Sequence, residues 1–199
     1  MSEGDDNIPS LTDTEKILWR ATESDFAAMG EALCNGTTTP DDVEGAFARL
    51  LSMDYDPHKH RNALHVPADA GEHAAVIETI LRRIPDGWGR WLSVDAGWYP
   101  LVIATDARLA ALHPRYRVHQ IKEKFGTLRY YWWPADGQTL SPELSAALDA
   151  VVEDAERASA LICERCGQPG VLQQSRRAWV ETLCAFCAAA LGYLPVQPH

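Results

Sequence analysis

Cys163-Glu-Arg-Cys166 and, after seventeen further residues, Cys184-Ala-Phe-Cys187 are the stretch that decides how the C-terminal end folds. Spacing of the form CxxC-x17-CxxC is typical of structural zinc sites. Each CxxC pair wraps one tight turn around a metal, and two pairs supply four thiolates in a tetrahedral shell. Because that shell leaves no position for water or substrate, we expect one structural zinc ion here. The alternative is four unligated thiols.

The residues that follow the first pair indicate the type of finger. Short strands are predicted at 171–174 and 178–182, and the run from Cys184 to Leu191 has a helical pattern that Gly192 ends. A knuckle, a hairpin and a ligand pair in the first turn of a helix predict a treble-clef finger. A zinc ribbon, which takes both ligand pairs from hairpins, is the alternative.

Residues 116–133 are the best strand candidates, because two β-rich runs flank the turn sequence Phe125-Gly126-Thr127. An uninterrupted first strand places Val118, Gln120, Lys122 and Lys124 on one face and His119, Ile121 and Glu123 on the other. On the second strand Leu128, Tyr130 and Trp132 oppose Arg129, Tyr131 and Trp133. One face is therefore expected to be core and the other basic and aromatic, and a slip of one residue would exchange them.

Helices are predicted on both sides of the hairpin. Ser141-Pro142-Glu143 begins the clearest one, which runs directly into the first cysteine pair. Two further helices are predicted at about 70–84 and 101–112. The first fifty residues predict two or three short helices. Their start and stop signals are Thr12-x-x-Glu15, a bend or restart at Ser24-Asp25, a stop at Asn35-Gly36 and a second start at Thr39-Pro40.

Residues 54–69 contain two prolines and no clear period, which predicts a loop. The loop contains a group of acidic and histidine residues that could form a second metal site, although a solvated loop is the simpler interpretation. These residues are Asp54, Asp56, His58, His60 and His65. Cys34 is expected to be a buried thiol rather than a nucleophile, because nothing in the sequence nominates a base for it.

The net charge of −10 is unevenly distributed. Residues 1–44 hold eleven Asp and Glu against two Lys and Arg, a net of −9, so the rest of the chain carries only −1. The segment 108–133 is locally basic, with six Lys and Arg against one Glu. Such asymmetry can indicate an interaction surface, and a solvated face is the alternative.

The chain contains no run of eighteen apolar residues, so no membrane-spanning helix is expected. Its acidic and polar start, MSEGDDNIPS, is unlike a secretory signal, which predicts a cytoplasmic protein. A reducing cytoplasm in turn favours metal binding over disulfide formation by the paired cysteines.

Several enzyme classes are excluded by their motifs. The chain has no GxGxxG, no P-loop and no GxSxG. It lacks the HxE of zinc deaminases, and no histidine lies between His119 and His199, which excludes a ββα-metal nuclease built on the cysteine pairs. We therefore expect a binding protein rather than an enzyme, and the Asp and His residues of 54–73 are the remaining candidates for catalysis.

A set of motifs occurs in order along the chain. These are Gly97-Trp98-Tyr-Pro-Leu101, Gln120-Ile-Lys-Glu-Lys-Phe-Gly-Thr-Leu-Arg-Tyr-Tyr131, Ala155-Glu-Arg-Ala-Ser159, Cys163-Glu-Arg-Cys166-Gly-Gln-Pro-Gly170, Trp179 and Thr182-Leu-Cys184. Their order resembles a widespread set of uncharacterised bacterial and prophage-borne proteins that share KEKFGxLRxY, a helix and a cysteine-rich tail. The likeness covers about residues 85–190. It implies a zinc-stabilised module and a bacterial or phage setting.

The sequence therefore predicts an α+β protein in three parts: an acidic helical region with a histidine-containing loop (1–66), a core with a β-hairpin and a long helix (67–160), and a four-cysteine zinc finger (161–199). The hairpin would contact nucleic acid or an acidic partner through basic and aromatic side chains, namely Lys122, Lys124, Arg129, Tyr131 and Trp133. Alternatively, the acidic region would bind a basic protein, as an inhibitor or an immunity-type protein does.

Overall fold

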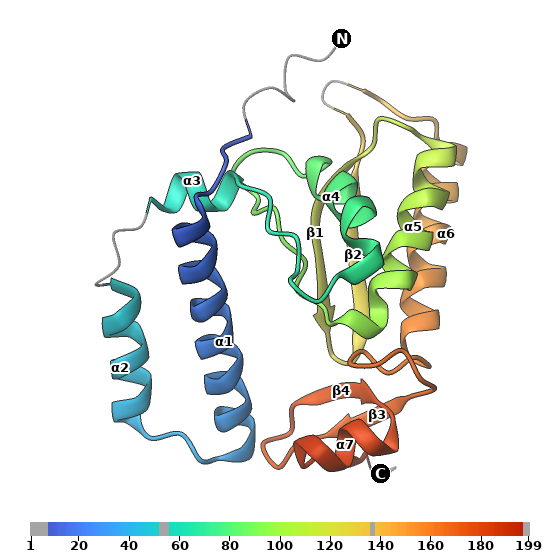
Figure 1. Cartoon of the computed structure of the whole chain (residues 1–199). Coiled ribbons are helices and arrows are strands. Elements are labelled where there is room, and N and C mark those ends of the chain that lie inside the picture. The colour runs from blue at the N-terminus through green and yellow to red at the C-terminus, as the bar shows by residue number, and fades with distance from the viewer. Residues whose placement is uncertain (1–7, 52–55, 136–137, 197–199) are drawn as a thin grey trace.

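The computed structural model describes residues 8–51, 56–135 and 138–196 and has the predicted α+β fold (Figure 1). Its helices are α1 (Asp13–Asn35), α2 (Pro40–Leu51), α3 (Pro57–Asn62), α4 (Ala74–Arg82), α5 (Tyr99–Leu112), α6 (Pro142–Ser159) and α7 (Ala185–Leu191), with 3-10 turns η1 (Gly71–His73) and η2 (Ala96–Trp98). Its strands are β1 (Arg117–Lys124), β2 (Thr127–Trp133), β3 (Val171–Gln174), β4 (Val180–Leu183) and β5 (Leu194–Pro195). Within the described residues, no helix combines the length and the apolar character needed to cross a bilayer.

The larger hydrophobic core lies between the β1–β2 hairpin and the helices on one of its faces. Figure 1 shows α5 and α6 side by side next to the hairpin, with α4 packed against α5. Each element contributes fully buried apolar side chains, among them Ile77, Ile80, Val102, Leu109, Ile121, Leu128 and Leu148. A small second cluster lies in the finger, where β4-β3-β5 form an antiparallel sheet.

A β-bulge in β1 changes which side chains share a face. The register shifts between Val118, which pairs with Trp132, and Gln120, which pairs with Tyr131. The bulge adds one residue to β1 between Val118 and Gln120. Val118 and Ile121, three positions apart, therefore point to the same face of the hairpin, and both are buried. The prediction that Val118 shares a face with Lys122 is therefore wrong, since it assumed an uninterrupted strand.

The first helix is longer than predicted. Helix α1 runs without a break for 23 residues, so the restart expected at Ser24-Asp25 is wrong. Isolated polar residues with low helix propensity weaken a helix but do not interrupt its hydrogen bonds. The capping box is confirmed, because Thr12 Oγ1 accepts the Glu15 N–H and the Glu15 carboxylate accepts the Thr12 N–H. Gly36 ends the helix in the left-handed region, with φ 72°.

The predicted loop at 54–69 contains helix α3. Asp56 caps it by accepting the N–H groups of His58 and Lys59, and Pro57 occupies the first turn. Thr39-Pro40 carries the same start signal, and α2 begins there as predicted. Asp54 lies outside the described residues.

His60 and His65 are buried, so the expectation of a solvated loop is wrong for these two residues. The His65 ring lies 4.0 Å from the Trp19 ring of α1 between centroids, and its Nε2 is 2.6 Å from the His60 carbonyl oxygen. Burial lowers the pKa of both imidazoles. The two histidines therefore attach α1 to the core, together with an ion pair between Lys59 and Glu15 at 2.7 Å.

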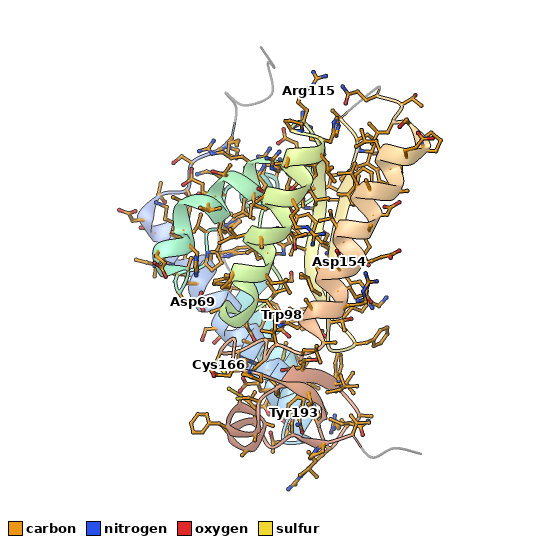
Figure 2. All side chains as sticks on the ribbon, turned by 90° about the vertical axis from the view of Figure 1, so that its right-hand side faces the viewer. Asp69, Trp98, Arg115, Asp154, Cys166 and Tyr193 are labelled. Atoms are coloured by element: carbon orange, nitrogen blue, oxygen red, sulfur yellow. The ribbon has the colours of Figure 1, made fainter. Side chains whose placement is uncertain are left out.

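The finger joins the core through a very close backbone approach at η2. A Cβ on Gly97 would lie 2.3 Å from the Cys163 carbonyl oxygen and 2.4 Å from the Gly167 nitrogen. Next to it, the fully buried Trp98 donates its Nε1–H to the Ile162 carbonyl at 2.8 Å. Figure 2 shows Trp98 at this boundary, with Cys166 and Tyr193 in the finger below it and Arg115 at the far end of the core.

Gly97→Ala should therefore separate the finger from the core. Because the new Cβ would meet rigid backbone on two sides, we expect the free energy of unfolding to fall by about 1–3 kcal/mol. Gly30→Ala is the matched control, since nothing lies within 4 Å of a Cβ at that helical position. It should leave stability unchanged or raise it by up to about 1 kcal/mol. Equal denaturant midpoints for the two variants would contradict the close approach.

Candidate metal centre

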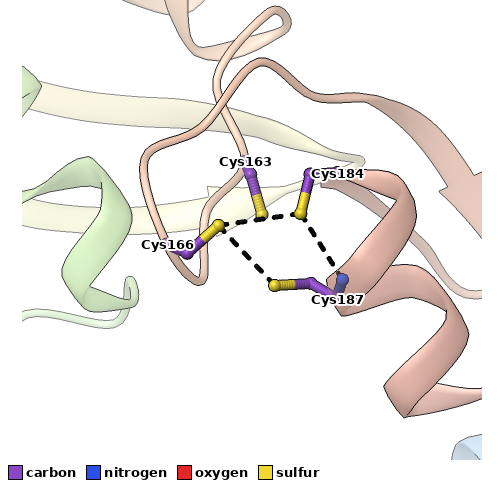
Figure 3. A group of neighbouring side chains, drawn as sticks. All are labelled: Cys163, Cys166, Cys184 and Cys187. Carbon is purple, nitrogen blue, oxygen red and sulfur yellow. Dashed lines mark hydrogen bonds between the residues drawn. The ribbon is translucent and has the colours of Figure 1, made fainter.

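The four predicted cysteines come together at one point of the finger (Figure 3). All four sulfur atoms lie within 4.8 Å of one another. Cys166 Sγ is 3.7 Å from both Cys184 Sγ and Cys187 Sγ, whereas a disulfide bond is about 2.05 Å long. All four thiols are free. The cluster is thus a set of four converging sulfur donors that could hold a metal ion.

Local backbone structure places the first pair. Gly167 has a φ of 74°, which suits a glycine directly after the second ligand, and its N–H donates to the Cys163 carbonyl at 2.8 Å. The Cys163 N–H donates in turn to the Gln168 carbonyl at 2.7 Å. These bonds close a tight knuckle, and Cys163 itself is fully buried.

The second pair lies at the start of α7. Cys184 is the N-cap residue, with extended backbone angles, and its Sγ accepts the Cys187 N–H at 3.4 Å. Gly192 ends the helix in the left-handed region, as predicted. A knuckle, the β3–β4 hairpin and a ligand pair in a helix's first turn together form the treble-clef arrangement, so the zinc-ribbon alternative is not the one adopted.

The helix start also favours the charged form of one thiol. The Cys187 backbone N–H lowers the pKa of Cys184 to about 7. Burial acts in the opposite direction on Cys187 and raises its pKa. Four thiolates so close together repel one another, and a divalent cation between them removes that repulsion. The donor set and its electrostatics therefore fit a bound metal.

An acidic cluster with one arginine surrounds the first cysteine pair. Arg165 Nε lies 2.8 Å from Asp95 Oδ2, and Arg165 Nη2 lies 3.7 Å from Glu31 of α1. Glu164 is only 4% exposed, and burial, followed by the charges of Asp95 and other nearby carboxylates, raises its pKa to about 9. Arg165 thus links the finger to both η2 and α1.

The predicted binding residues lie on the hairpin, apart from the cysteines. Lys122 is paired with Arg129 across the strands, and its Nζ lies 5.6 Å from the Tyr131 ring centroid. Lys124 is exposed at the turn, and Trp133 stacks on His119 at the opposite end. The structure therefore places Lys122, Lys124, Tyr131 and Trp133 along the face that points away from α5 and α6.

Arg129 differs from the other predicted binding residues. Its Nη1 lies 2.6 Å from Glu156 Oε1 of α6, and its side chain is 24% exposed. Its charge is thus already compensated within the protein.

Three residues that are not predicted from the sequence also belong to this surface, and two of them lie on the finger. Phe125 of the hairpin turn and Arg177 and Trp179 of the β3–β4 turn line one groove with Lys122 and Lys124. The only available signal was the pair Arg176-Arg177 between two predicted strands. Nothing in the sequence indicates that the two turns are neighbours.

The Cys34 side chain lies outside the described part of the structure. The chain matches no protein-family model, no curated protein and no solved structure. Its function must therefore be inferred from the geometry of its own residues.

We expect one divalent ion per chain, and elemental analysis of purified protein measures it. Cys166→Ser should lose the ion and unfold the finger, because a neutral hydroxyl replaces a thiolate ligand. Acidification should release the ion as well, since protons compete for the thiolates and metal affinity falls as pH falls. Cys34→Ser is the control and should keep full occupancy. Equal metal content in the two variants would contradict the site.

Proposed function

We propose that the chain is a zinc-stabilised binding protein whose hairpin contacts single-stranded nucleic acid. The sulfur geometry supports zinc. A tetrahedral site with Zn–S bonds of about 2.3 Å has sulfur–sulfur edges of about 3.8 Å. The two Cys166 separations of 3.7 Å agree with that edge. Four thiolates are also the ligand set that zinc occupies in closed, structural sites.

The distribution of ion pairs carries the nucleic-acid proposal. Most cations elsewhere in the described structure are paired with carboxylates, for example Arg82 with Glu78 and Arg108 with Asp154. Five cations of the hairpin and the finger turn form no ion pair within the described residues. They are Arg117, Lys122, Lys124, Arg176 and Arg177. In an acidic chain, cations that remain unpaired together are available for phosphate groups.

Exposed aromatic rings on the same surface favour a single strand over a duplex. Four rings next to these cations are largely solvent-accessible: Phe125 (68%), Trp133 (60%), Trp179 (62%) and Tyr131 (43%). Bases of a single strand can stack on such rings, whereas bases of a duplex are already stacked on one another. Alternating cations and rings are typical of surfaces that bind single strands with little sequence preference. A bacterial or prophage origin, implied by the sequence resemblance, belongs to the same proposal.

A second candidate function uses the acidic helices. Helices α1 and α2 expose apolar side chains between their acids, including Ile17 (65%) and Phe47 (49%). Such a surface suits a basic protein partner, as an inhibitor or immunity-type protein would bind. It predicts capture of a protein from nuclease-treated lysate that Phe47→Asp abolishes. The nucleic-acid proposal predicts that nuclease removes the captured material.

Lys122→Ala combined with Lys124→Ala should weaken binding of a fluorescent single-stranded oligonucleotide. The affinity falls with salt, and each phosphate contact makes the plot of log K against log salt steeper by about 0.7. The double variant should therefore make this plot shallower by about 1.4. Arg157→Ala is the control, because Arg157 is exposed but paired with Asp154 and Glu153. Anisotropy titrations at several salt concentrations measure both quantities. Wild-type protein whose binding does not respond to salt would refute the proposal.

A further inference from the structure

A groove of about 430 Å³ lies between the hairpin turn and the turn of the finger. Lys122, Lys124 and Phe125 line it from the core, and Arg177, Ala178 and Trp179 line it from the finger. Its size falls within the range of small-molecule sites, which is about 300–1,000 Å³. Because its lining comes from both the core and the finger, the groove exists only while the finger is folded and docked against the core.

Both turns that form the groove have unusual backbone angles. Within the described residues, Phe125 (φ 56°) and Ala178 (φ 65°) are the two residues other than glycine with positive φ. Side chains with a Cβ rarely adopt this conformation, which is disfavoured unless the surroundings enforce it. Phe125 and Gly126 (φ 78°) are the two central residues of the hairpin turn and have the positive φ of a type I′ turn, so the backbone on this side of the groove is fixed.

Specific contacts hold the two turns in place. Thr182 Oγ1 donates to the Gly126 carbonyl at 2.6 Å, which fixes the hairpin turn on the finger. Ser175 is buried, and its Oγ accepts the N–H groups of Arg177 and Trp179 at 3.3 and 3.2 Å. The Trp179 ring is thus exposed on a turn that is fixed before any ligand arrives.

The chemistry of the lining matches the two parts of a nucleotide. Phe125 and Trp179 offer exposed ring faces to a base, while Lys122, Lys124 and Arg177 offer positive charge to phosphates. Glu123 also lines the groove, but its Oε1 accepts the Gly126 N–H at 2.5 Å. The carboxylate is therefore directed at the hairpin backbone.

We propose that this groove takes one unstacked base of a bound single strand, which stacks on Phe125 and Trp179 while the adjoining phosphates contact the three cations. This inference rests on the proposed function and adds a base-binding subsite to it. It also assigns the finger a direct part in recognition, because Trp179 and Arg177 belong to the finger.

The test compares two oligonucleotides of equal length, one with normal nucleotides and one made abasic throughout its middle. Abasic positions keep the phosphates but offer no ring for stacking. Phe125→Asn and Trp179→Ala each remove one ring, and asparagine tolerates positive φ, so the turn is preserved. We expect each variant to bind the normal strand about 5- to 150-fold more weakly and the abasic strand as wild type does.

Phe186→Ala is the matched control, because Phe186 is an 82% exposed ring on α7 outside the groove. It should bind both strands as wild type does, and Trp179→Phe should retain much of the affinity. Metal content and thermal unfolding show that each variant is folded. If the Phe125 and Trp179 variants bind the normal strand as tightly as Phe186→Ala, or lose both strands equally, the subsite is wrong and the proposed function stands. If wild-type protein binds neither strand, both proposals fall.

Discussion

The buried hydrogen bond from the Thr182 hydroxyl to the Gly126 carbonyl determines how the finger and the hairpin turn are arranged relative to each other. Leu172 packs into the space beside Gly126, where a Cβ would come within 2.2 Å of its Cδ1. Thr182 lies two residues before Cys184, so whatever fixes the second cysteine pair also fixes this donor. The sulfur cluster shapes the finger, the finger holds the hairpin turn in place, and the two turns together form the groove.

The features predictable from the sequence are those set by neighbours along the chain. The spacing within each CxxC pair, the Thr12 capping box and the glycine that ends α7 each involve residues a few positions apart, and all are found as predicted. The bulge in β1 has no such local signal, so the strand faces were partly misassigned. The burial of His60 and His65 depends on Trp19, more than forty residues earlier, and no local pattern indicates that contact.

The sequence also does not show which individual cations of the hairpin form ion pairs. Lys122 and Arg129 are directly opposite each other in the hairpin and equivalent by sequence reasoning. Only the fold shows that Glu156 of α6 neutralises Arg129, while Lys122 remains unpaired among the described residues. The division of cations into paired and unpaired is therefore a property of the tertiary structure. It removes Arg129 from the predicted surface and adds Arg177 of the finger.

An overall charge of −10 is compatible with nucleic-acid binding because electrostatic interactions in salt are short-ranged. At physiological ionic strength the screening length is about 8 Å, so a phosphate on the hairpin responds mainly to the groups next to it. Nine of the ten net negative charges belong to residues 1–44, whereas the hairpin and the finger turn carry five cations without an ion pair among the described residues. Under the proposed function, the acidic remainder would repel phosphates from the rest of the surface and leave the hairpin face as the place where a strand binds.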